Sequence, residues 1–143
     1  MILFFAPLTQ VAYAQSAGTP SIFGYQGRLA DVNGNLLGGS GTTYYFKFSV
    51  WDNANVASGT RLWPTALPGV VTSVVKQGVF NVNVGDIANG YPDVLDYNFN
   101  TNKDVFLQVE VSSNNVSYQT LAPRQRIAST PFARVAGSVS GAD

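Results

Sequence analysis

The residue types that carry most enzyme chemistry are scarce in this chain. It contains no His, no Cys and a single Glu, Glu110. A Ser-His pair, a thiolate nucleophile and the common zinc sites are therefore excluded. Glu110 with an Asp could form a carboxylate pair for glycoside cleavage. However, Glu110 alternates with core valines on an expected strand, where a solvated side chain is the simpler interpretation. We predict a protein that is not an enzyme.

Two phrases that combine charge with backbone-shaping residues bracket the chain, one over residues 23–31 and one over residues 122–133. Guanidinium forks in them could bind strand-end carbonyls or Asp31 and so fasten the two ends of a domain. A basic spot that binds an anion or a partner is the alternative. The residues of this expected structural bracket are Tyr25, Gln26, Arg28, Arg124, Gln125 and Arg126.

Aromatic side chains suggest a second kind of site. On the outer face of a sheet, rings flanked by Asn and Gln can stack on sugars. The residues expected to do so are Tyr45, Trp51 and Trp63, with Tyr91, Tyr97 and Phe106 as further candidates. Packing under a long loop is the commoner fate of such rings, so glycan binding stays the alternative prediction.

Oxygen-bearing side chains alternate over residues 31–35, as at the start of a calcium loop. The pattern fails further on, where Leu36 replaces the required Gly and Thr42 replaces a bidentate Glu. A plain turn is therefore expected. Asp residues in the segment 85–102 and just beyond it indicate calcium only weakly, so we predict neither a metal nor a cofactor.

The first residues read as an export signal. Residues 1–14 carry no charge, hold an apolar run and end in Ala12-Tyr13-Ala14, which a signal peptidase accepts. An ordinary N-terminal strand is the alternative. We predict a signal peptide over 1–14, a flexible leader over 15–21, one domain over 22–136 and a linker-like tail over 137–143, in a secreted or cell-surface protein.

Charge and composition limit the partners. Eight basic and eight acidic side chains cancel, so nucleic acid and, after signal cleavage, a membrane are not expected as partners. With 45% hydrophobic and 11% charged residues, the chain can bury a core while covering its surface with uncharged polar groups. Without Cys, the exported domain depends on that core for stability.

Short alternating segments predict the fold. Residues 44–51 place Tyr44, Phe46, Phe48 and Val50 on one face, and residues 105–111 alternate in the same way. Further strands are expected over 22–30, 60–63, 70–76, 79–84, 116–121 and 126–128, with a hairpin turn at residues 77–78, a crossover between two sheets at 85–102 and a short helical turn over 131–136. Seven or eight such strands predict an antiparallel β-sandwich, Ig-like or jelly-roll-like.

The bracketing phrases also carry a resemblance. With the segments 44–52, 62–63 and 77–84, they resemble an N-terminal module of exported bacterial surface and tail-fibre-like proteins, over roughly residues 22–136. Gln77 and Phe132 depart mildly from that pattern, which has Asn and Tyr there. The resemblance implies an extracellular structural or adhesive role, without a defined activity.

Together these observations predict a noncatalytic, exported structural or adhesive module of a cell-surface or fibre-like protein. Its expected partners are proteins, either further copies of itself through an exposed strand edge or neighbouring domains of the same assembly. A carbohydrate-binding module is the alternative, in which a glycan is the partner.

Overall fold

The computed structural model describes residues 4–7 and 22–127, and these residues form an all-β fold. The elements are β1 (Phe4–Pro7), β2 (Phe23–Ala30), β3 (Thr42–Trp51), β4 (Arg61–Trp63), β5 (Val71–Val75), β6 (Val79–Val84), the 3₁₀ turn η1 (Ile87–Asn89), β7 (Val105–Ser112), β8 (Gln119–Thr120) and β9 (Gln125–Ile127). Every strand pairing is antiparallel, so the predicted fold class is confirmed.

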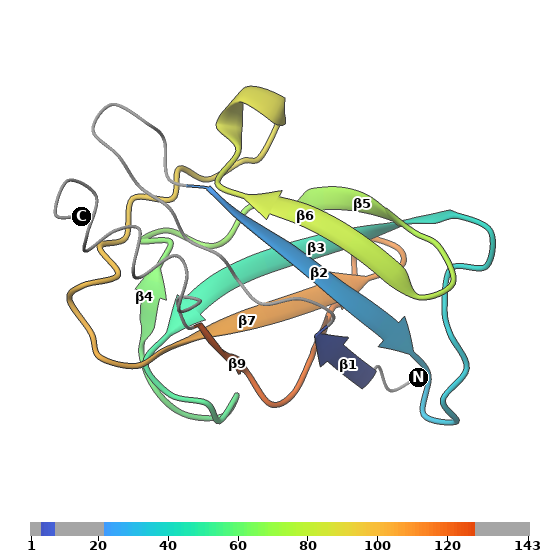
Figure 1. The fold of residues 1–143 in the computed structure, drawn as a ribbon, viewed down its shortest axis with the longest axis horizontal. Helices are drawn as coiled ribbons and strands as arrows, with labels where there is room; N and C mark the ends of the chain where they lie inside the picture. Colours follow the sequence, from blue (N-terminus) through green and yellow to red (C-terminus); the bar gives the residue numbers. More distant parts are fainter. Residues whose placement is uncertain (1–3, 8–21, 128–143) are drawn as a thin grey trace, which may run out of the picture.

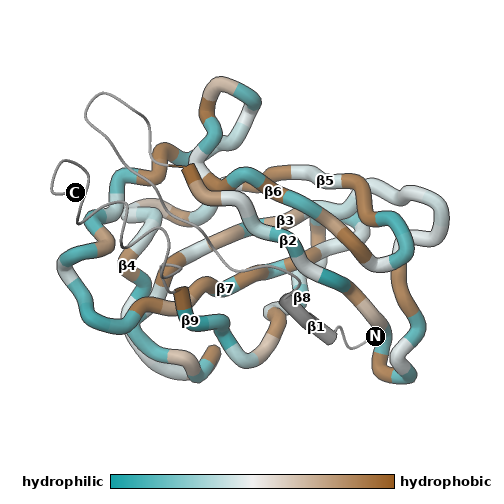
Figure 2. The backbone as a smooth tube through the Cα atoms, in the orientation of Figure 1, coloured by the Kyte–Doolittle hydropathy of each residue, from teal (hydrophilic) through white to brown (hydrophobic). Residues whose placement is uncertain are grey.

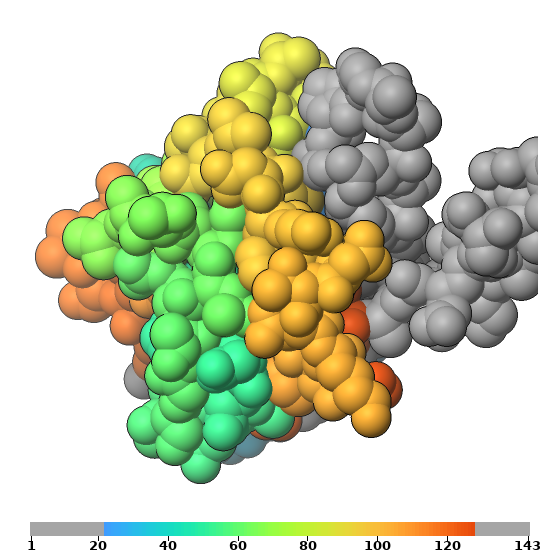
Figure 3. Space-filling view, turned by 90° about the vertical axis from the view of Figure 1, so that its left-hand side faces the viewer, coloured from blue at the N-terminus to red at the C-terminus, as the bar shows by residue number. Residues whose placement is uncertain are grey.

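The strands form two sheets that face each other (Figure 1). The smaller sheet has the order β1-β2-β6. In the larger sheet, β3 and β7 pair along seven residues at the centre, β4 and β5 share the outer side of β3, and β8 and β9 share the outer side of β7. The crossover from β6 to β7 (yellow to orange) packs beside the segment after β3 (green) at one end of the molecule (Figure 3).

Alternating side chains close the space between the sheets, because successive residues of a strand point to opposite faces. The predicted inward set of β3 is buried, as are the alternate residues of β6 and β7. The hydropathy of the backbone changes repeatedly along these strands (Figure 2). The Phe46 ring of the larger sheet stacks on the Phe80 ring of the smaller one with 4.5 Å between centroids. Tyr25 contacts both Phe48 and Phe80, which joins the two layers through one aromatic cluster.

The hairpin predicted at residues 77–78 is wrong in one respect. The turn is present, but β5 pairs with β3 and β6 pairs with β2, so the turn joins the two sheets. The ladder between them ends after the bridge between Lys76 and Val79. Gly78 accepts a hydrogen bond from the Leu29 N–H and donates one to the Leu37 carbonyl. These bonds hold the turn against β2 and the segment that follows it.

Two expected elements differ at the C-terminal side. The strand expected over 116–121 is confined to β8, because Asn114 Oδ1 accepts the backbone N–H groups of Val116 and Ser117 and holds them in a turn. Residues 125–127 form β9, one position earlier than expected. The helical turn expected over 131–136 and the tail 137–143 lie outside the described residues.

Residues 4–7 of the expected signal peptide form β1, which lies beside the end of β2 (Figure 1). Residues 1–3 and 8–21 lie outside the described residues, so cleavage and export stay predictions. No helix within 4–7 and 22–127 has the length and hydropathy needed to span a membrane.

The turn between β2 and β3 depends on a glycine. Gly38 has a φ of 93°, and a Cβ there would lie 2.3 Å from the Val75 carbonyl oxygen. We therefore expect Gly38→Ala to lower the free energy of unfolding by about 3 kcal/mol, combining backbone strain with a clash against rigid backbone.

Gly34→Ala is the matched control. Gly34 also has a positive φ, of 85°, but nothing lies within 4 Å of its Cβ position. Strain alone should cost about 1 kcal/mol. Urea unfolding of both variants measures the difference, and equal losses would show that the close approach at Gly38 has no energetic effect.

Candidate functional site

The densest polar cluster joins the C-terminal phrase to the loop that leaves β3. Residues 52–60 turn back from β3 toward β4, and Asp52 begins this loop by accepting the Thr60 N–H at 2.7 Å. Asn53 and Asn55 make short Asx turns through their side-chain oxygens. These turns leave several loop carbonyls pointing to one side, where they need donors.

Arg124 supplies those donors. Its Nη1 lies 2.9, 2.8 and 2.7 Å from the carbonyl oxygens of Asn53, Asn55 and Ser58. Its Nη2 donates to the Val56 carbonyl at 3.2 Å, and its Nε donates to Gln108 Oε1 of β7 at 2.8 Å. The side chain is only 3% exposed. One arginine therefore ties the 53–58 loop to the outer face of the larger sheet.

An aromatic ring covers the guanidinium as well. The Arg124 Cζ lies 3.8 Å from the centroid of the Trp51 ring, and Trp51 is itself fixed by its Nε1–H bond to Ser49 Oγ at 2.8 Å. Burial lowers the pKa of Arg124 below its ordinary value, and the Asp52 carboxylate acts in the opposite direction. Because the ordinary pKa of arginine is so high, the guanidinium stays charged and can donate all its bonds.

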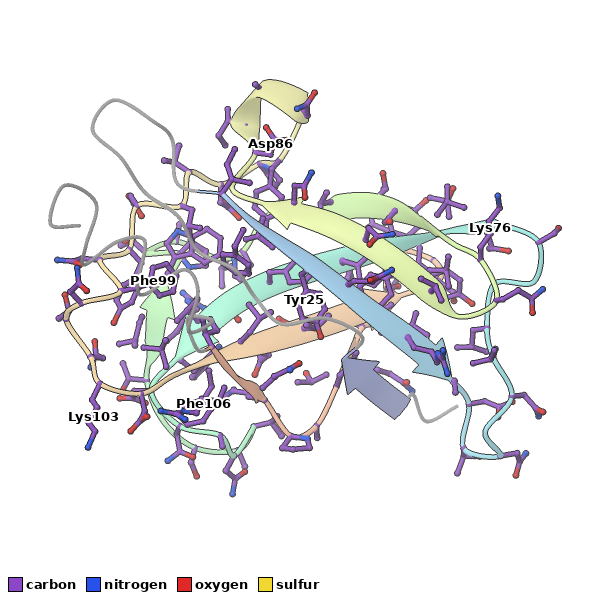
Figure 4. All side chains as sticks on the ribbon, in the orientation of Figure 1. Tyr25, Lys76, Asp86, Phe99, Lys103 and Phe106 are labelled. Carbon is purple, nitrogen blue, oxygen red and sulfur yellow. The ribbon has the colours of Figure 1, made fainter. Side chains whose placement is uncertain are left out.

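The two bracketing phrases meet through a different pair. The Tyr25 hydroxyl donates to Gln125 Oε1 at 3.3 Å, across 100 positions of the chain. Burial raises the pKa of Tyr25 well above its ordinary value, which keeps the hydroxyl protonated as a donor. Figure 4 shows Tyr25 near the middle of the molecule, between the sheets. The first strand of the domain thus contacts the last.

The remaining bracket residues do not share this contact. Arg126 pairs with Asp104 at 2.8 Å, with both side chains largely exposed. Arg28 is exposed and Gln26 is half-buried, both on the outward side of β2. The acceptors of Arg124 are loop carbonyls and Gln108 Oε1, and Asp31 accepts from its own turn. We expected these arginines to bind strand-end carbonyls or Asp31. That expectation is wrong, because Arg124 and Arg126 bind other acceptors.

Residues 31–35 form a plain turn. Asp31 Oδ1 accepts the backbone N–H groups of Asn33 and Asn35, each at 2.9 Å. The bond from the Asn35 N–H is the main cause that lowers the pKa of Asp31. Within the described ranges, no three acidic residues gather as metal ligands would.

The three residues expected to stack on glycans lie in different settings. Trp63 is 1% exposed and part of the core, so its assignment to glycan stacking is wrong. The Trp63 ring is stacked against the Tyr91 ring, and the Trp63 Nε1–H donates to the Val94 carbonyl at 2.8 Å. Trp51 is half-buried beneath Arg124. Tyr45 is half-buried on the outer face of β3 and lies opposite Ser112.

A small cavity lies between the edges of β5 and β6, beside η1. Its volume is about 160 Å³, and its polar lining includes Asn81, Asn83, Asp86 and Asn89. Asp86 lies at the start of the 3₁₀ turn (Figure 4). Tyr91 also lines it: this residue is 4% exposed, and its buried hydroxyl has no hydrogen-bond partner among the described residues. Burial and the Asp93 carboxylate both raise the pKa of Tyr91.

Residues 24–124 match the family described as "Domain of unknown function (DUF8740)". The chain belongs to the DUF8740 family. No curated protein matches it, and no solved structure does.

The DUF8740 region covers the strands from β2 to β8. It begins at Gly24, one residue into β2, and ends at Arg124 itself. The loop anchor made by Arg124 therefore lies entirely within it, whereas Gln125 and β9 follow directly after it.

Two features of the candidate sites in this DUF8740 domain were not predicted from the sequence. Gln108, the β7 acceptor for Arg124, stands at an outward position of its strand yet is buried. Tyr91 was a further candidate for stacking on sugars, but the sequence did not predict the burial of its hydroxyl. The one available signal for Tyr91 is its place in a crossover with few apolar residues, where a ring must fold back onto the core.

Proposed function

We propose that this chain is a noncatalytic, exported structural or adhesive module of a cell-surface or fibre-like assembly. Its partners are proteins, namely further copies of the module or neighbouring domains. The observation that carries the proposal is the tie between the first and last strands of the domain, from Tyr25 to Gln125. A module held within a longer assembly bears load at its ends, and this contact resists their separation.

The positions of the first residue of β2 and the last residue of β9 support the same function. The start of β2 and the end of β9 both lie in the left half of the molecule in Figure 1. The turn around Gly78, which joins the sheets, lies at the opposite end. A domain attached through one end presents the other end and both sheet faces to partners. The Arg124 anchor closes the loop beside the attachment end.

Export and assembly can be tested in a bacterial host that expresses the chain with its own first 14 residues. We expect processing after Ala14, labelling by a reagent that cannot enter cells, and assemblies visible by chromatography and negative-stain imaging. An unprocessed cytoplasmic product would contradict export. A strictly monomeric surface protein that converts a substrate would contradict the noncatalytic structural function.

The cavity beside η1 favours a second candidate, a carbohydrate-binding module. Side-chain amides, one carboxylate and a buried hydroxyl that has no partner within residues 4–7 and 22–127 are groups that bind the hydroxyls of a neutral sugar. Asp86 is the one charged residue among those that line it, which disfavours anions. At about 160 Å³ the cavity is below the roughly 300 Å³ of a drug-sized site, so it fits one small ring.

A glycan array with the wild type and Tyr91→Phe tests this candidate. The variant keeps the buried ring and removes only the hydroxyl, so the fold should survive while sugar retention falls. Asn53→Ala, in the distant loop, is the control. Retention that both variants preserve, or no retained glycan at all, would rule out the cavity as a sugar site. Loss of retention on adding a chelator would identify a cation instead.

A further inference from the structure

The outer edge of β2 is occupied by residues from the expected signal peptide. Strand β1 pairs antiparallel with the last four residues of β2, from Phe4 opposite Ala30 to Pro7 opposite Gly27. Along its opposite edge, β2 pairs with β6. Removal of residues 1–14 would take β1 away and leave this side of β2 without its strand.

The alternation of an antiparallel ladder determines which N–H and C=O groups of β2 point to that edge. The Leu29 N–H donates to Gly78 and the Leu29 carbonyl accepts from Leu37, so Leu29 uses both groups on the β6 side. Neighbouring residues point the opposite way. Gly24, Gln26, Arg28 and Ala30 therefore direct their N–H and C=O groups to the outer edge. Pro7, which lacks an N–H, stands opposite Gly27, where none is needed.

Without β1, none of the other strands within residues 22–127 pairs along this edge of β2. Eight residues span about 26 Å at about 3.3 Å each, which is longer than an average strand. Proteins protect such edges with Pro, charges or covering elements. Strand β2 contains no Pro, and Arg28 is its one charged residue. In the precursor, β1 covers the half of this edge that runs from Gly27 to Ala30.

We propose that β2 of a second copy takes the place of β1 once the leader is removed. Two β2 strands related by a two-fold axis pair antiparallel and join the smaller sheets of the two copies into one. The proposal rests on the proposed self-associating function and names the surface involved. The leader strand thereby delays association until processing has occurred.

The alternation of side chains restricts the register. Directly opposite residues share a sheet face, so inward residues must meet inward residues. Centring the axis on Gly27 satisfies this condition and places Arg28 opposite Gln26 of the second copy, twice in the pair. It also sets Leu29 opposite Tyr25 on the inner side. No like charges meet, and the chain has a formal net charge of zero, so no general repulsion opposes association.

The test uses the full chain with a site-specific protease sequence placed within residues 15–21. Sedimentation and light scattering are compared before and after cutting, with circular dichroism to verify that the cut protein stays folded. We expect a monomer before cutting and a concentration-dependent dimer afterwards. A synthetic peptide of residues 2–8 should return the cut protein to monomer. Equal association before and after cutting, or a folded cut protein that stays monomeric, would overturn the proposal.

Substitutions at Gln26 test the register, since this half-buried outward side chain is not part of the core. Gln26→Glu should place a carboxylate opposite Arg28 twice and tighten the dimer about fivefold, whereas Gln26→Lys should weaken it by a similar factor. The opposite order would overturn the Gly27-centred pairing. A processed, surface-exposed protein that remains monomeric would refute this edge and leave the export and structural function standing.

Discussion

Replacing Arg124 with Ala is expected to lower the free energy of unfolding by about 3 kcal/mol. The substitution removes the donor for four loop carbonyls and for Gln108 Oε1 at once. Buried acceptors left without partners cost about 1–3 kcal/mol each, although carbonyls in an exposed loop recover part of this from water. Loss of the contact with the Trp51 ring adds to the effect. Thermal unfolding should shift down by about 10 °C.

Two further variants make this prediction specific. Arg124→Lys keeps the charge but cannot span the loop with a fork of five donors, so it should lose most of the same stability. Arg126→Ala removes an arginine two residues away whose ion pair with Asp104 is exposed, and should cost less than about 0.5 kcal/mol. If Arg124→Ala and Arg126→Ala unfold alike in urea, the loop anchor does not stabilise the domain.

Replacing Trp63 with Ala is expected to cost about 4 kcal/mol, because the ring is enclosed in the core. The Trp63 Nε1–H also donates a hydrogen bond to the Val94 carbonyl, and the ring is stacked against Tyr91. Both contacts position the crossover of residues 85–102 over the end of the sandwich. The variant should therefore unfold more easily and also loosen the crossover. Hydrogen exchange at residues 91–95 and urea unfolding measure the two effects.

The controls separate size from chemistry. Trp63→Phe retains much of the apolar volume and loses the indole N–H, so it should cost about half as much as Trp63→Ala. Leu67→Ala, at a side chain 80% exposed nearby in sequence, should be close to neutral. If Trp63→Ala folds with wild-type stability, the ring is not part of the core, and glycan stacking by Trp63 would have to be considered again.

The layers of this protein follow from its sequence. Period-two alternation over Tyr44, Phe46 and Phe48 determines which side of β3 is buried, because a strand offers only two faces and apolar side chains leave water together. The same argument places Phe80 and Val82 inward. The scarcity of Cys, His and Glu is likewise a property of composition and sets limits on chemistry before any folding is considered.

Only the tertiary structure decided how the polar and ambiguous residues are used. The outward residue Gln108 is buried and the outward residue Trp51 is half-buried, because a distant loop and Arg124 cover them. No local pattern predicts a contact across 16 or 71 positions. The turn at Gly78 joins two sheets because β5 pairs with β3 and β6 pairs with β2. These pairings depend on all the strands of the fold. The period of the apolar residues is a local property, so it predicts which face of a strand is buried. Hydrogen-bond and strand partners depend on which distant groups the packed layers bring within bonding distance.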